Sequence, residues 1–404
     1  MRYPRKRKLA SVLVFVTLAL ILLQVPFAYR AWKLRSMAAR IRSSDTRASF
    51  TRSDDQREYV GLLHVHTSFT GEISRTYDEM LRAAADNNLD FVILTEHYSA
   101  NFDTSAATLN GIHGSTLFIG GNEVNAVYDD RFLMVPGGPD AADYRLMPSV
   151  PVVDKIHAAG SIAVLAYPEK YGAWDAAFDG IEVANINTML RQTNPLTAAL
   201  DFIWSGHVDR SLMIERLVSS PDSNLRRFDE IAAGRKIFLT GGTDAHSAIG
   251  FHLLGDELGY HLASVKIDPY TEIFRLVRLH VLSHQPLDRA VLLAALKKGS
   301  FFVGFDVLGD SRGFAFTANG GEKGSGMGSE IPFEPGIGFK ATTPLPARIV
   351  LLCNGDKVAE VRDSTELTAT GLSPGAYRVA AYREDLGDDL KDKPWILSNP
   401  IFVR

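Results

Sequence analysis

Four short polar motifs each follow a run of apolar residues in this chain, and this arrangement limits the folds the chain can adopt. The motifs are His64-Val-His66, Glu96-His97, Gly121-Asn-Glu123 and Asp244-Ala-His246. A short apolar run bounded by polar residues is typical of a buried strand, so each motif is expected at a strand's carboxyl end. The carboxyl ends of parallel strands meet at one mouth of a barrel or one edge of a sheet. Imidazoles and carboxylates gathered there form a ligand set for Zn, Mn or Fe.

The joint occurrence of the motifs carries more weight than any one of them. Residues two apart in a strand face the same side, so His64 and His66 can bind one ion together. A single His-x-His pair is a weak signal, but Asp244 and His246 repeat its spacing. The alternative is four unrelated strand ends, which requires 4 of the 11 histidines to fall in these motifs by chance. We therefore predict a metal centre with the ligands His64, His66, Glu96, His97, Glu123, Asp244 and His246.

Charge is unevenly distributed along the chain. Residues 1–56 hold 12 Lys and Arg against 3 Asp, a net charge of +9, and the whole chain is at −4, which leaves −13 for residues 57–404. An acidic body argues against binding to a nucleic-acid backbone, so no nucleic-acid partner is expected. The single cysteine, Cys353, excludes an internal disulfide.

An uncharged segment of 21 residues runs from Leu9 to Tyr29. It is long enough to cross the hydrocarbon core of a membrane, and the sequence after it is a poor signal-peptidase site. We therefore expect a single-pass membrane anchor at residues 1–35, rather than a cleaved signal peptide or a buried core helix. Basic residues flank the segment on both sides, so the positive-inside rule is nearly balanced. A single N-terminal anchor usually leaves the body outside the cytoplasm, and an extracytoplasmic body is the expectation here.

The rest of the chain is predicted to contain a stalk and two domains. Residues 36–57 are polar and are interpreted as the stalk. Residues 58–306 alternate strand-like and helix-like stretches, which indicates parallel strands with crossover helices. Residues 307–404 contain short strand-like stretches separated by turn signals, which predicts a small antiparallel β-sandwich. The glycine-rich stretch from Asn319 to Ser329 lacks the Gly-Lys-Ser/Thr order of a phosphate-binding loop and is interpreted as a hairpin loop.

The motifs in their contexts resemble those of the polymerase-and-histidinol-phosphatase (PHP) metal-dependent phosphoesterases. The matching stretches are Leu63-His-Val-His-Thr67, Leu94-Thr-Glu-His97, Gly121-Asn-Glu123 and Thr243-Asp-Ala-His246. The resemblance covers roughly residues 58–305 and implies a distorted seven-stranded β/α barrel with up to three ions, usually Zn, Mn or Fe. The stretches Pro374-Gly-Ala-Tyr-Arg-Val and Trp395-Ile-Leu-Ser-Asn-Pro-Ile resemble the C-terminal β-domain of the CehA/McbA-like branch, which includes hydrolases of carbamate and related esters.

The chain departs from this family pattern at three positions. Glu96 stands where the family usually has aspartate, a mild change. Arg131 and Tyr167 stand where the family usually has histidines, and arginine cannot ligate a metal at ordinary pH. We therefore expect one or two ions rather than three. Arg131 can instead hold an anionic substrate by a bidentate contact, or it can fill the space by pairing with Asp129, Asp130 or Glu182. Arg131 and Tyr167 are the candidate catalytic residues.

The expected function is that of a hydrolase in which a divalent metal activates water to cleave a phosphoester or related ester of a small molecule. Two alternatives remain: a carboxyl or carbamate ester or amide hydrolase, and a catalytically degenerate, membrane-tethered binding protein. Glu182 and Asn185 are candidates to support the metal ligands, although a turn cap is equally plausible for Asn185. Beyond the motifs, His252 and His261 are placed in a loop that can reach the mouth. The remaining histidines are expected on the surface or in helices: His113, His157, His207, His280 and His284.

Overall fold

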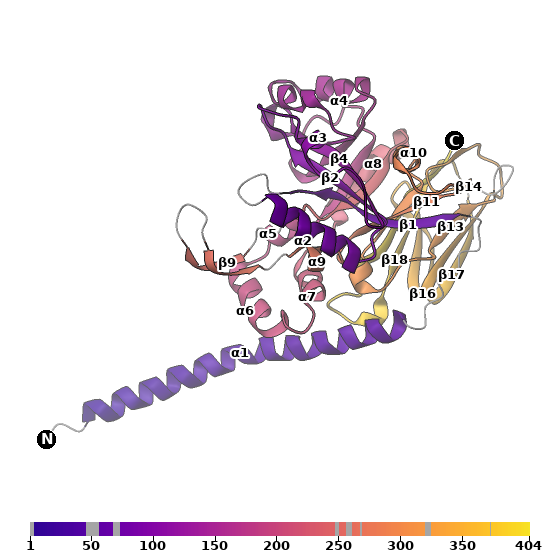
Figure 1. Ribbon diagram of the computed structural model, residues 1–404. Coiled ribbons are helices and arrows are strands. Elements are labelled where there is room, and N and C mark those ends of the chain that lie inside the picture. Colours follow the sequence, from indigo (N-terminus) through magenta and orange to yellow (C-terminus); the bar gives the residue numbers. More distant parts are fainter. Residues whose placement is uncertain are drawn as a thin grey trace.

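The computed structural model describes residues 4–45, 56–67, 73–246, 250–255, 261–266, 269–319, 325–371 and 373–404. Figure 1 shows a body of mixed α/β structure and one long N-terminal helix that projects from it. The predicted α/β class and the apolar N-terminal helix are therefore confirmed.

A mixed sheet forms the frame of the first domain. Its strands are β1 (Arg57–Val65), β2 (Phe91–His97), β3 (Gly111–His113), β4 (Thr116–Asn125), β5 (Arg131–Val135), β6 (Ile162–Ala166), β7 (Gly180–Asn185) and β8 (Phe238–Gly242). β1, β2 and β4 pair in parallel, and so do β6, β7 and β8. β5 lies between β4 and β6 and runs antiparallel to both. The carboxyl ends of six strands and the amino end of β5 consequently lie at one edge.

The two ends of this sheet approach each other without closing a ladder. Among the described residues, β8 meets β1 through an isolated bridge between Val65 and Ala245. Two backbone hydrogen bonds reinforce it, since the His66 amide donates to Ala245 O (3.0 Å) and the Asp244 amide donates to His64 O (2.7 Å). The expected closed seven-stranded barrel is therefore not shown, but the last residues of β1 and the loop after β8 are held in contact.

Helices cover the sheet (Figure 1). They are α2 (Ile73–Asp86), α3 (Thr104–Ala107), α4 (Ser149–Ala158), α5 (Ile186–Arg191), α6 (Pro195–Ser205), α7 (Arg210–Leu217), α8 (Asp222–Gly234), α9 (Tyr270–Ile273) and α10 (Arg289–Lys298). Short 3-10 turns are η1 (Val127–Asp129), η2 (Pro139–Leu146), η3 (Pro168–Lys170), η4 (Asp306–Leu308) and η5 (Glu384–Leu386). α10 has a side-chain cap at its start, where the Asp288 side chain accepts from Val291 N, and it ends at Gly299, which has φ of 80°.

Strands make up most of the chain from residue 278 onward, including residues 307–404, for which strands were predicted. These are β11 (Arg278–Ser283), β12 (Phe301–Gly304), β13 (Ala315–Ala318), β14 (Ser325–Gly326), β15 (Glu330–Ile331), β16 (Gly338–Cys353), β17 (Asp356–Thr370), β18 (Gly375–Tyr382), β19 (Pro394–Ser398) and β20 (Ile401–Val403). β11 pairs with β1 and β12, and β12 pairs with β19. One hydrogen-bonded sheet therefore crosses the predicted boundary at residue 306. A separate hairpin consists of β9 (Gly250–Gly255) and β10 (His261–Lys266).

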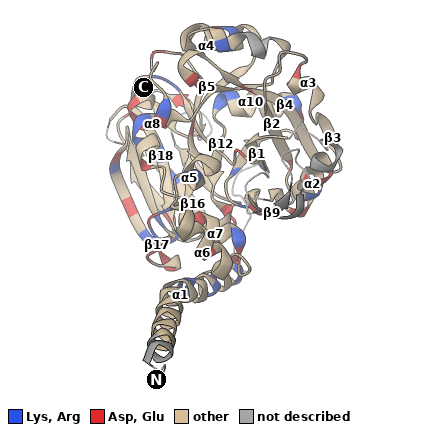
Figure 2. Cartoon of the chain, turned by 90° about the vertical axis from the view of Figure 1, so that its left-hand side faces the viewer, with Lys and Arg blue, Asp and Glu red and all other residues tan. Residues whose placement is uncertain are grey.

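The long helix α1 (Pro4–Asp45) covers the predicted anchor and the first part of the predicted stalk. It continues through residue 35 without a break, so residues 36–45 are helical. Its apolar window is not buried in the body, whereas Leu34 and Met37 on its second half are buried at 0% and 4% exposure. In Figure 2, the part of α1 between its grey end and the body shows no colour of a charged residue, in line with the uncharged segment Leu9–Tyr29. α1 is long and apolar enough to cross a membrane.

Candidate metal centre

Four predicted ligands converge at the carboxyl edge of the sheet. His64 is in β1, His66 directly follows β1, Glu123 is in β4, and Asp244 lies two residues beyond β8. Their ligand atoms lie within 4.8 Å of one another, and all four side chains are buried. This group of His64, His66, Glu123 and Asp244 could hold a metal ion, as the sequence motifs predict.

The spacing of the ligand atoms matches a small coordination sphere. Glu123 Oε2 lies 3.2 Å from His66 Nε2 and 3.3 Å from His64 Nε2. Asp244 Oδ1 lies 3.4 Å and 3.6 Å from the same two nitrogens. Ligand atoms bound tetrahedrally at about 2.0–2.2 Å from a metal lie about 3.3–3.6 Å apart. Four of the six edges of such a tetrahedron are therefore already set by the protein.

Three buried side-chain atoms at the centre have no hydrogen-bond partner among the described residues. They are His66 Nδ1, His66 Nε2 and Asp244 Oδ1. The separations of His66 Nε2 from the two carboxylates are short, but they lack hydrogen-bond angles. A buried polar atom without a partner costs about 1–3 kcal/mol, so one that persists calls for an explanation. A cation bound between these atoms would satisfy His66 Nε2 and Asp244 Oδ1.

The backbone at the centre adopts conformations that side chains usually avoid. His64, Tyr167 and Asp244 have φ of 65°, 53° and 48°. Left-handed backbone costs a non-glycine residue about 1–2 kcal/mol, and such residues gather at functional sites. At His64 the left-handed backbone coincides with a shift in the register between β1 and β2, which changes the direction of the His64 and His66 side chains. Gly242 explains the Thr-Gly-Gly sequence before Asp244, because a Cβ there would collide with the Glu182 carboxylate and His64 Cβ.

Residues outside this group of four hold the candidate ligands in place by hydrogen bonds. Glu182 Oε1 lies 2.7 Å from His64 Nδ1, and Asn185 Nδ2 donates to Glu182 Oε2 at 3.0 Å. This contact places a proton on His64 Nδ1, so in the neutral imidazole the lone pair of Nε2 faces the other ligands. Asn187 Nδ2 donates to Asp244 O, and Tyr270 Oη donates to His66 O. Both support roles suggested for Glu182 and Asn185 are seen, and Asn185 also caps α5.

A second group at the rim combines His66 with His97 and His246. His97 Nε2 lies 3.4 Å from His246 Nε2. Each of these imidazoles stacks against His66, with centroid separations of 4.5 Å and 4.3 Å, and their own centroids are 5.6 Å apart. The side chains of His97 and His246 are 53% and 29% exposed, so this group is more open than the first. His66 belongs to both groups. Because its Nε2 has one lone pair, this nitrogen can bind an ion in only one of them.

Glu96 is not drawn into either group. Its carboxylate instead accepts hydrogen bonds from Thr67 N (3.0 Å), Thr67 Oγ1 (2.7 Å) and Thr108 Oγ1 (2.7 Å). In this arrangement Glu96 ties the segment after β1 to the residues that follow α3. The structure therefore places Glu96 beside the centre in a supporting position.

Arg131 and Tyr167 contact the two carboxylates of the centre. Arg131 Nη1 donates to Glu123 Oε1 at 2.6 Å, and its Nε and Nη2 donate to Asp129 Oδ1 at 3.2 Å. Tyr167 Oη donates to Asp244 Oδ2 at 2.9 Å, and the Arg131 guanidinium lies over the Tyr167 ring. One oxygen of each carboxylate is thus taken by a protein donor, and the other faces the histidines. Of the pairings expected for Arg131, the one with Asp129 is seen, and the contact with Glu123 is additional.

The charges of the centre stabilise cations between its carboxylates. Burial lowers the pKa of His66, but Asp244 and Glu123 overcome burial and raise this pKa to about 9. Burial raises the pKa of Asp244, but the neighbouring His64 and His66 outweigh it and bring this pKa below its ordinary value. At the rim, burial and the nearby His66 lower the pKa of His246 to about 4. His64 and His66 are therefore stabilised in their protonated, positively charged forms, whereas His246 is a neutral imidazole at pH 7.

The structure also locates the other histidines and the residues that sequence reasoning missed. The side chains of His252 and His261 lie outside the described residues. His280, expected on the surface or in a helix, is instead fully buried in β11. Thr67, Thr108, Asn187 and Tyr270 were not predicted. Their sequence neighbourhoods carry no metal-ligand spacing, and they reach the centre only through the fold.

Comparisons with known proteins assign no family. No protein-family model matches the chain, and no curated protein matches it. Among solved structures, PsfC from Pseudomonas syringae PB-5123 is similar over 59% of this chain and 88% of its own, with 14% sequence identity and a TM-score of 0.32. A likeness at this level carries no argument about fold or function.

Proposed function

We propose that this chain is a membrane-anchored, metal-dependent hydrolase that cleaves a phosphoester or related ester of a small molecule. The convergence of His64, His66, Glu123 and Asp244, with separations of 3.2–3.6 Å between imidazole nitrogens and carboxylate oxygens, is the observation that carries the proposal. The PHP-like motifs support it, and with them we propose that the curved sheet is a variant of the distorted barrel of that family.

The residues around the centre have distinct proposed roles. A bound Zn, Mn or Fe ion would supply a water molecule whose pKa is lowered toward about 7. Glu182 holds His64 in the required tautomer, as its 2.7 Å contact indicates. Arg131 is 28% exposed and carries a permanent positive charge, which can stabilise negative charge on a substrate. Tyr167 Oη holds Asp244 and remains a neutral donor, because burial and the surrounding carboxylates raise its pKa.

The number of ions is proposed to be one or two. Arg131 and Tyr167 already occupy one oxygen each of Glu123 and Asp244. The remaining oxygens point to the same pair of histidines, which defines one inner position. The rim group of His66, His97 and His246 offers a second position that shares His66 with the first.

The contact between Arg131 and Glu123 also favours a second candidate function. A guanidinium 2.6 Å from a predicted metal ligand partly neutralises the carboxylate and so weakens metal binding. The chain would then be a catalytically degenerate binding protein held at the membrane by α1. A hydrolase of carboxyl or carbamate esters or amides is the other enzyme candidate, because the same centre can serve a carbonyl substrate.

The membrane part of the proposal rests on α1. Its apolar window has a mean hydropathy of 2.4 and is not buried in the body. We propose that this segment crosses the bilayer once and that the body lies outside the cytoplasm.

The test uses the full chain purified in detergent. Its metal content is measured together with turnover of a phosphomonoester, a phosphodiester and an aryl carboxyl ester. We expect bound transition metal and turnover of at least one substrate, with both lost in His66→Ala and Asp244→Asn, since each variant deletes a ligand. Matched controls are His113→Ala and Asp288→Asn, which change distant residues of the same types. Metal without turnover would favour the binding protein, and absence of metal from the wild type would reject both enzyme candidates.

A further inference from the structure

Helix α6 buries its polar face and exposes its apolar one. Asp201 and Ser205, four residues apart on one side, are both 0% exposed. Leu196 and Ile203 on the opposite side are 69% and 67% exposed. A helix on the surface of a protein in water normally shows the reverse arrangement. The apolar face of α6 is therefore built to contact something other than water.

The buried side of α6 is tied to α1 by charge. Arg30 Nη2 of α1 lies 2.7 Å from Asp201 Oδ2, and Arg216 Nη2 of α7 lies 3.1 Å from Asp201 Oδ1. Arg216 Nη1 also donates to Arg30 O at 2.8 Å. Asp201 is the one charged residue in the α6 sequence, so its burial leaves the outer face without charge. These contacts fix the orientation of α6 relative to the axis of α1.

A hydrogen bond sets the depth of α6 along α1. Trp204 Nε1 donates to Gln24 Oε1 at 2.9 Å. Gln24 lies five residues before Tyr29, the last residue of the uncharged segment, which corresponds to about 7–8 Å along a helix. The 21-residue segment is about 32 Å long, close to the roughly 30 Å of a hydrocarbon core. If the segment spans the core, this end of α6 reaches into the membrane boundary, where interfacial helices bury their apolar faces by about 5–10 Å.

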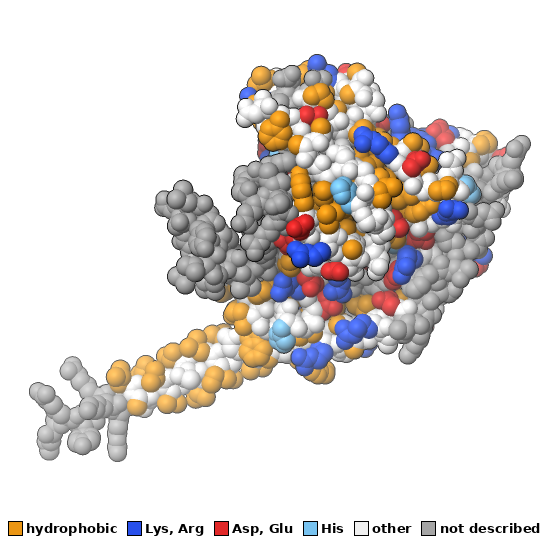
Figure 3. All heavy atoms as spheres, viewed as in Figure 1, with side chains coloured by type: hydrophobic (Ala, Val, Ile, Leu, Met, Phe, Trp, Pro, Cys, Tyr) orange, Lys and Arg blue, Asp and Glu red, His pale blue; other side chains and the backbone are white. Residues whose placement is uncertain are grey.

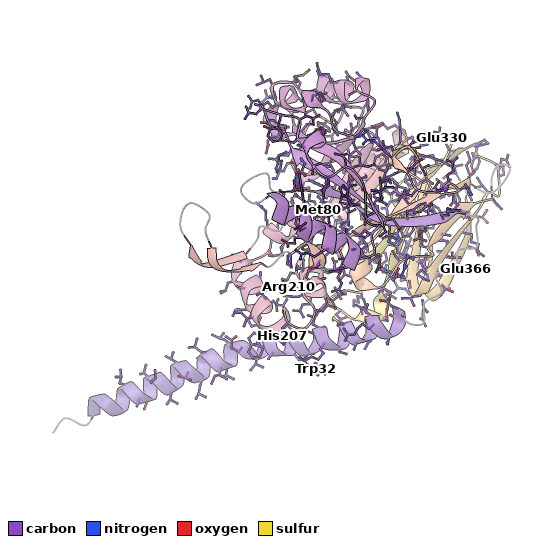
Figure 4. All side chains as sticks on the ribbon, in the orientation of Figure 1. Trp32, Met80, His207, Arg210, Glu330 and Glu366 are labelled. Carbon is purple, nitrogen blue, oxygen red and sulfur yellow. The ribbon has the colours of Figure 1, made fainter. Side chains whose placement is uncertain are left out.

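The surroundings of α6 have the composition of a membrane boundary. Figure 3 shows hydrophobic side chains along the projecting half of α1 as far as the body. Tyr29 and Trp32, 58% and 63% exposed, stack with a centroid distance of 5.8 Å just beyond this half. Aromatic residues are enriched at membrane interfaces. Figure 4 labels Trp32 on α1 and His207 just after α6, both where α1 meets the body.

We propose that α6 is an interfacial helix that inserts Leu196 and Ile203 into the bilayer that α1 crosses. The proposal rests on the proposed membrane anchoring by α1. The bilayer is the chosen occupant because the apolar face is uncharged and α6 is bonded, through Trp204, to Gln24 in the uncharged segment of α1. Together α1 and α6 fix the side of the body that faces the membrane. In Figures 1 and 2, β9 lies on this same side.

The test places a fluorophore on single cysteines in the full chain, reconstituted in lipid vesicles. Cys353 is replaced by alanine, and the environment-sensitive dye NBD is attached to Ile203→Cys. A matched control is Ile112→Cys, because Ile112 is 75% exposed on β3, and Leu20→Cys marks the span itself. Quenching is measured with lipids that carry a nitroxide near the headgroup and, separately, with aqueous iodide.

The expected result is strong loss of emission at positions 203 and 20 with the nitroxide lipids, and protection of both from iodide. Position 112 should show the opposite behaviour. Quenching at 20 but not at 203 would overturn the interfacial role of α6 and leave the anchor intact. Protection of 203 from both quenchers would mean that a protein covers α6, which also overturns the proposal. Absence of lipid quenching at 20 would overturn the anchor and, with it, this inference.

Discussion

Arg131 lies at the point where the family resemblance predicts a histidine, and its contacts explain how the fold tolerates the change. The guanidinium bonds to Glu123 and Asp129 and covers the Tyr167 ring. It therefore supplies a fixed positive charge next to a carboxylate of the centre. With all three of these contacts inside the protein, Arg131 is tied in place, and only its exposed part is free to meet a substrate.

Replacing Arg131 by histidine is expected to raise the number of bound metal ions per chain. The change removes a cation from Glu123, frees Glu123 Oε1, and adds an imidazole. Elemental analysis of the full chain measures the effect. Arg145→His is the matched control, since Arg145 is exposed and stacks on Tyr98 instead. Unchanged metal content in Arg131→His would show that Arg131 does not occupy a potential metal position.

The buried position of His280 was not predicted from the sequence. The middle of β11 is buried on both faces, and there His280 lies 2.7 Å from Glu58 Oε1 and 3.1 Å from Asp306 Oδ2 and stacks on Phe302. Its position in the sequence gives no sign of these partners, because Glu58 lies 222 residues away. Burial lowers the pKa of His280, but Asp306 and Glu58 overcome burial and raise this pKa to about 9.

This buried group predicts a loss of stability at alkaline pH. The folded-state pKa of His280 lies above the unfolded value of about 6.5, so its contribution is complete below pH 6.5 and disappears as pH rises through about 9. At about 1.4 kcal/mol per pKa unit, the contribution reaches at most about 3 kcal/mol. The melting temperature of the wild type should therefore fall more steeply between pH 6.5 and 9.5 than that of His280→Gln. If the melting temperatures of the two proteins fall by the same amount over this pH range, His280 does not contribute in this way.

The residues of the candidate metal centre could largely be predicted from the sequence. His64, His66, Glu123 and Asp244 come together because each follows an apolar strand, and parallel strands end at one edge. The contacts of Glu96 could not be predicted, since they depend on Thr67 and Thr108 in segments with no recognisable pattern. The sequence likewise gave no sign that Arg131 would bond to Glu123, because the antiparallel direction of β5 was not apparent.

Among the elements, α1 differs most from its expectation. Residues 36–57 were interpreted as a polar stalk, but the described part of them, residues 36–45, packs on the body. Arg40 Nη1 donates to Asp385 O, and Met37 is buried. The end of the predicted anchor is held in the same way, because Lys33 Nζ lies 3.0 Å from Asp389 Oδ1 and Leu34 is buried. The sequence shows that residues 36–45 are mostly polar, but not that they lie against the body.

Two truncations separate the membrane span of α1 from its packing on the body. Removal of residues 1–23 should leave the melting temperature nearly unchanged, because the apolar window of α1 is not buried in the body. Removal of residues 1–35 should lower it by several degrees, because it also deletes the Arg30 pair with Asp201 and the buried Leu34. Calorimetry of the two truncated proteins and the full chain in one detergent makes the comparison. Equal melting temperatures for both truncations would contradict the docking of α1.

At the scale of the whole molecule, the two predicted domains share one sheet. β12 pairs with β19, and the buried Asn399 joins the domains further. Its Oδ1 accepts from Leu239 N at 2.7 Å, and its Nδ2 donates to Leu239 O at 3.2 Å and Phe301 O at 3.0 Å. The strand content after residue 306 was predictable from turn signals, but pairing between distant strands has no local signature. Strand pairing and hydrogen bonds therefore cross the predicted boundary at residue 306, and we expect the two parts to unfold together.

Asn399→Ala is expected to destabilise both domains together. It leaves the Leu239 and Phe301 backbone groups unpaired, at about 1–3 kcal/mol for each buried group. The whole chain should then melt in one transition at a lower temperature. Asn319→Ala on the rim of the β-domain is a control of the same residue type. Two separate transitions, with only one of them shifted, would show that the domains unfold independently.

The central claim is that His64, His66, Glu123 and Asp244 hold a metal ion, and anomalous X-ray scattering from crystals of the full chain tests it most directly. Data collected at the Zn, Mn and Fe absorption edges locate any bound ion and identify its element. The account predicts a strong peak between the Nε2 atoms of the two histidines, Glu123 Oε2 and Asp244 Oδ1, and at most one further peak, at the rim beside His97 and His246. No peak at the inner position would contradict the account, and three peaks would show that Arg131 and Tyr167 do not displace an ion.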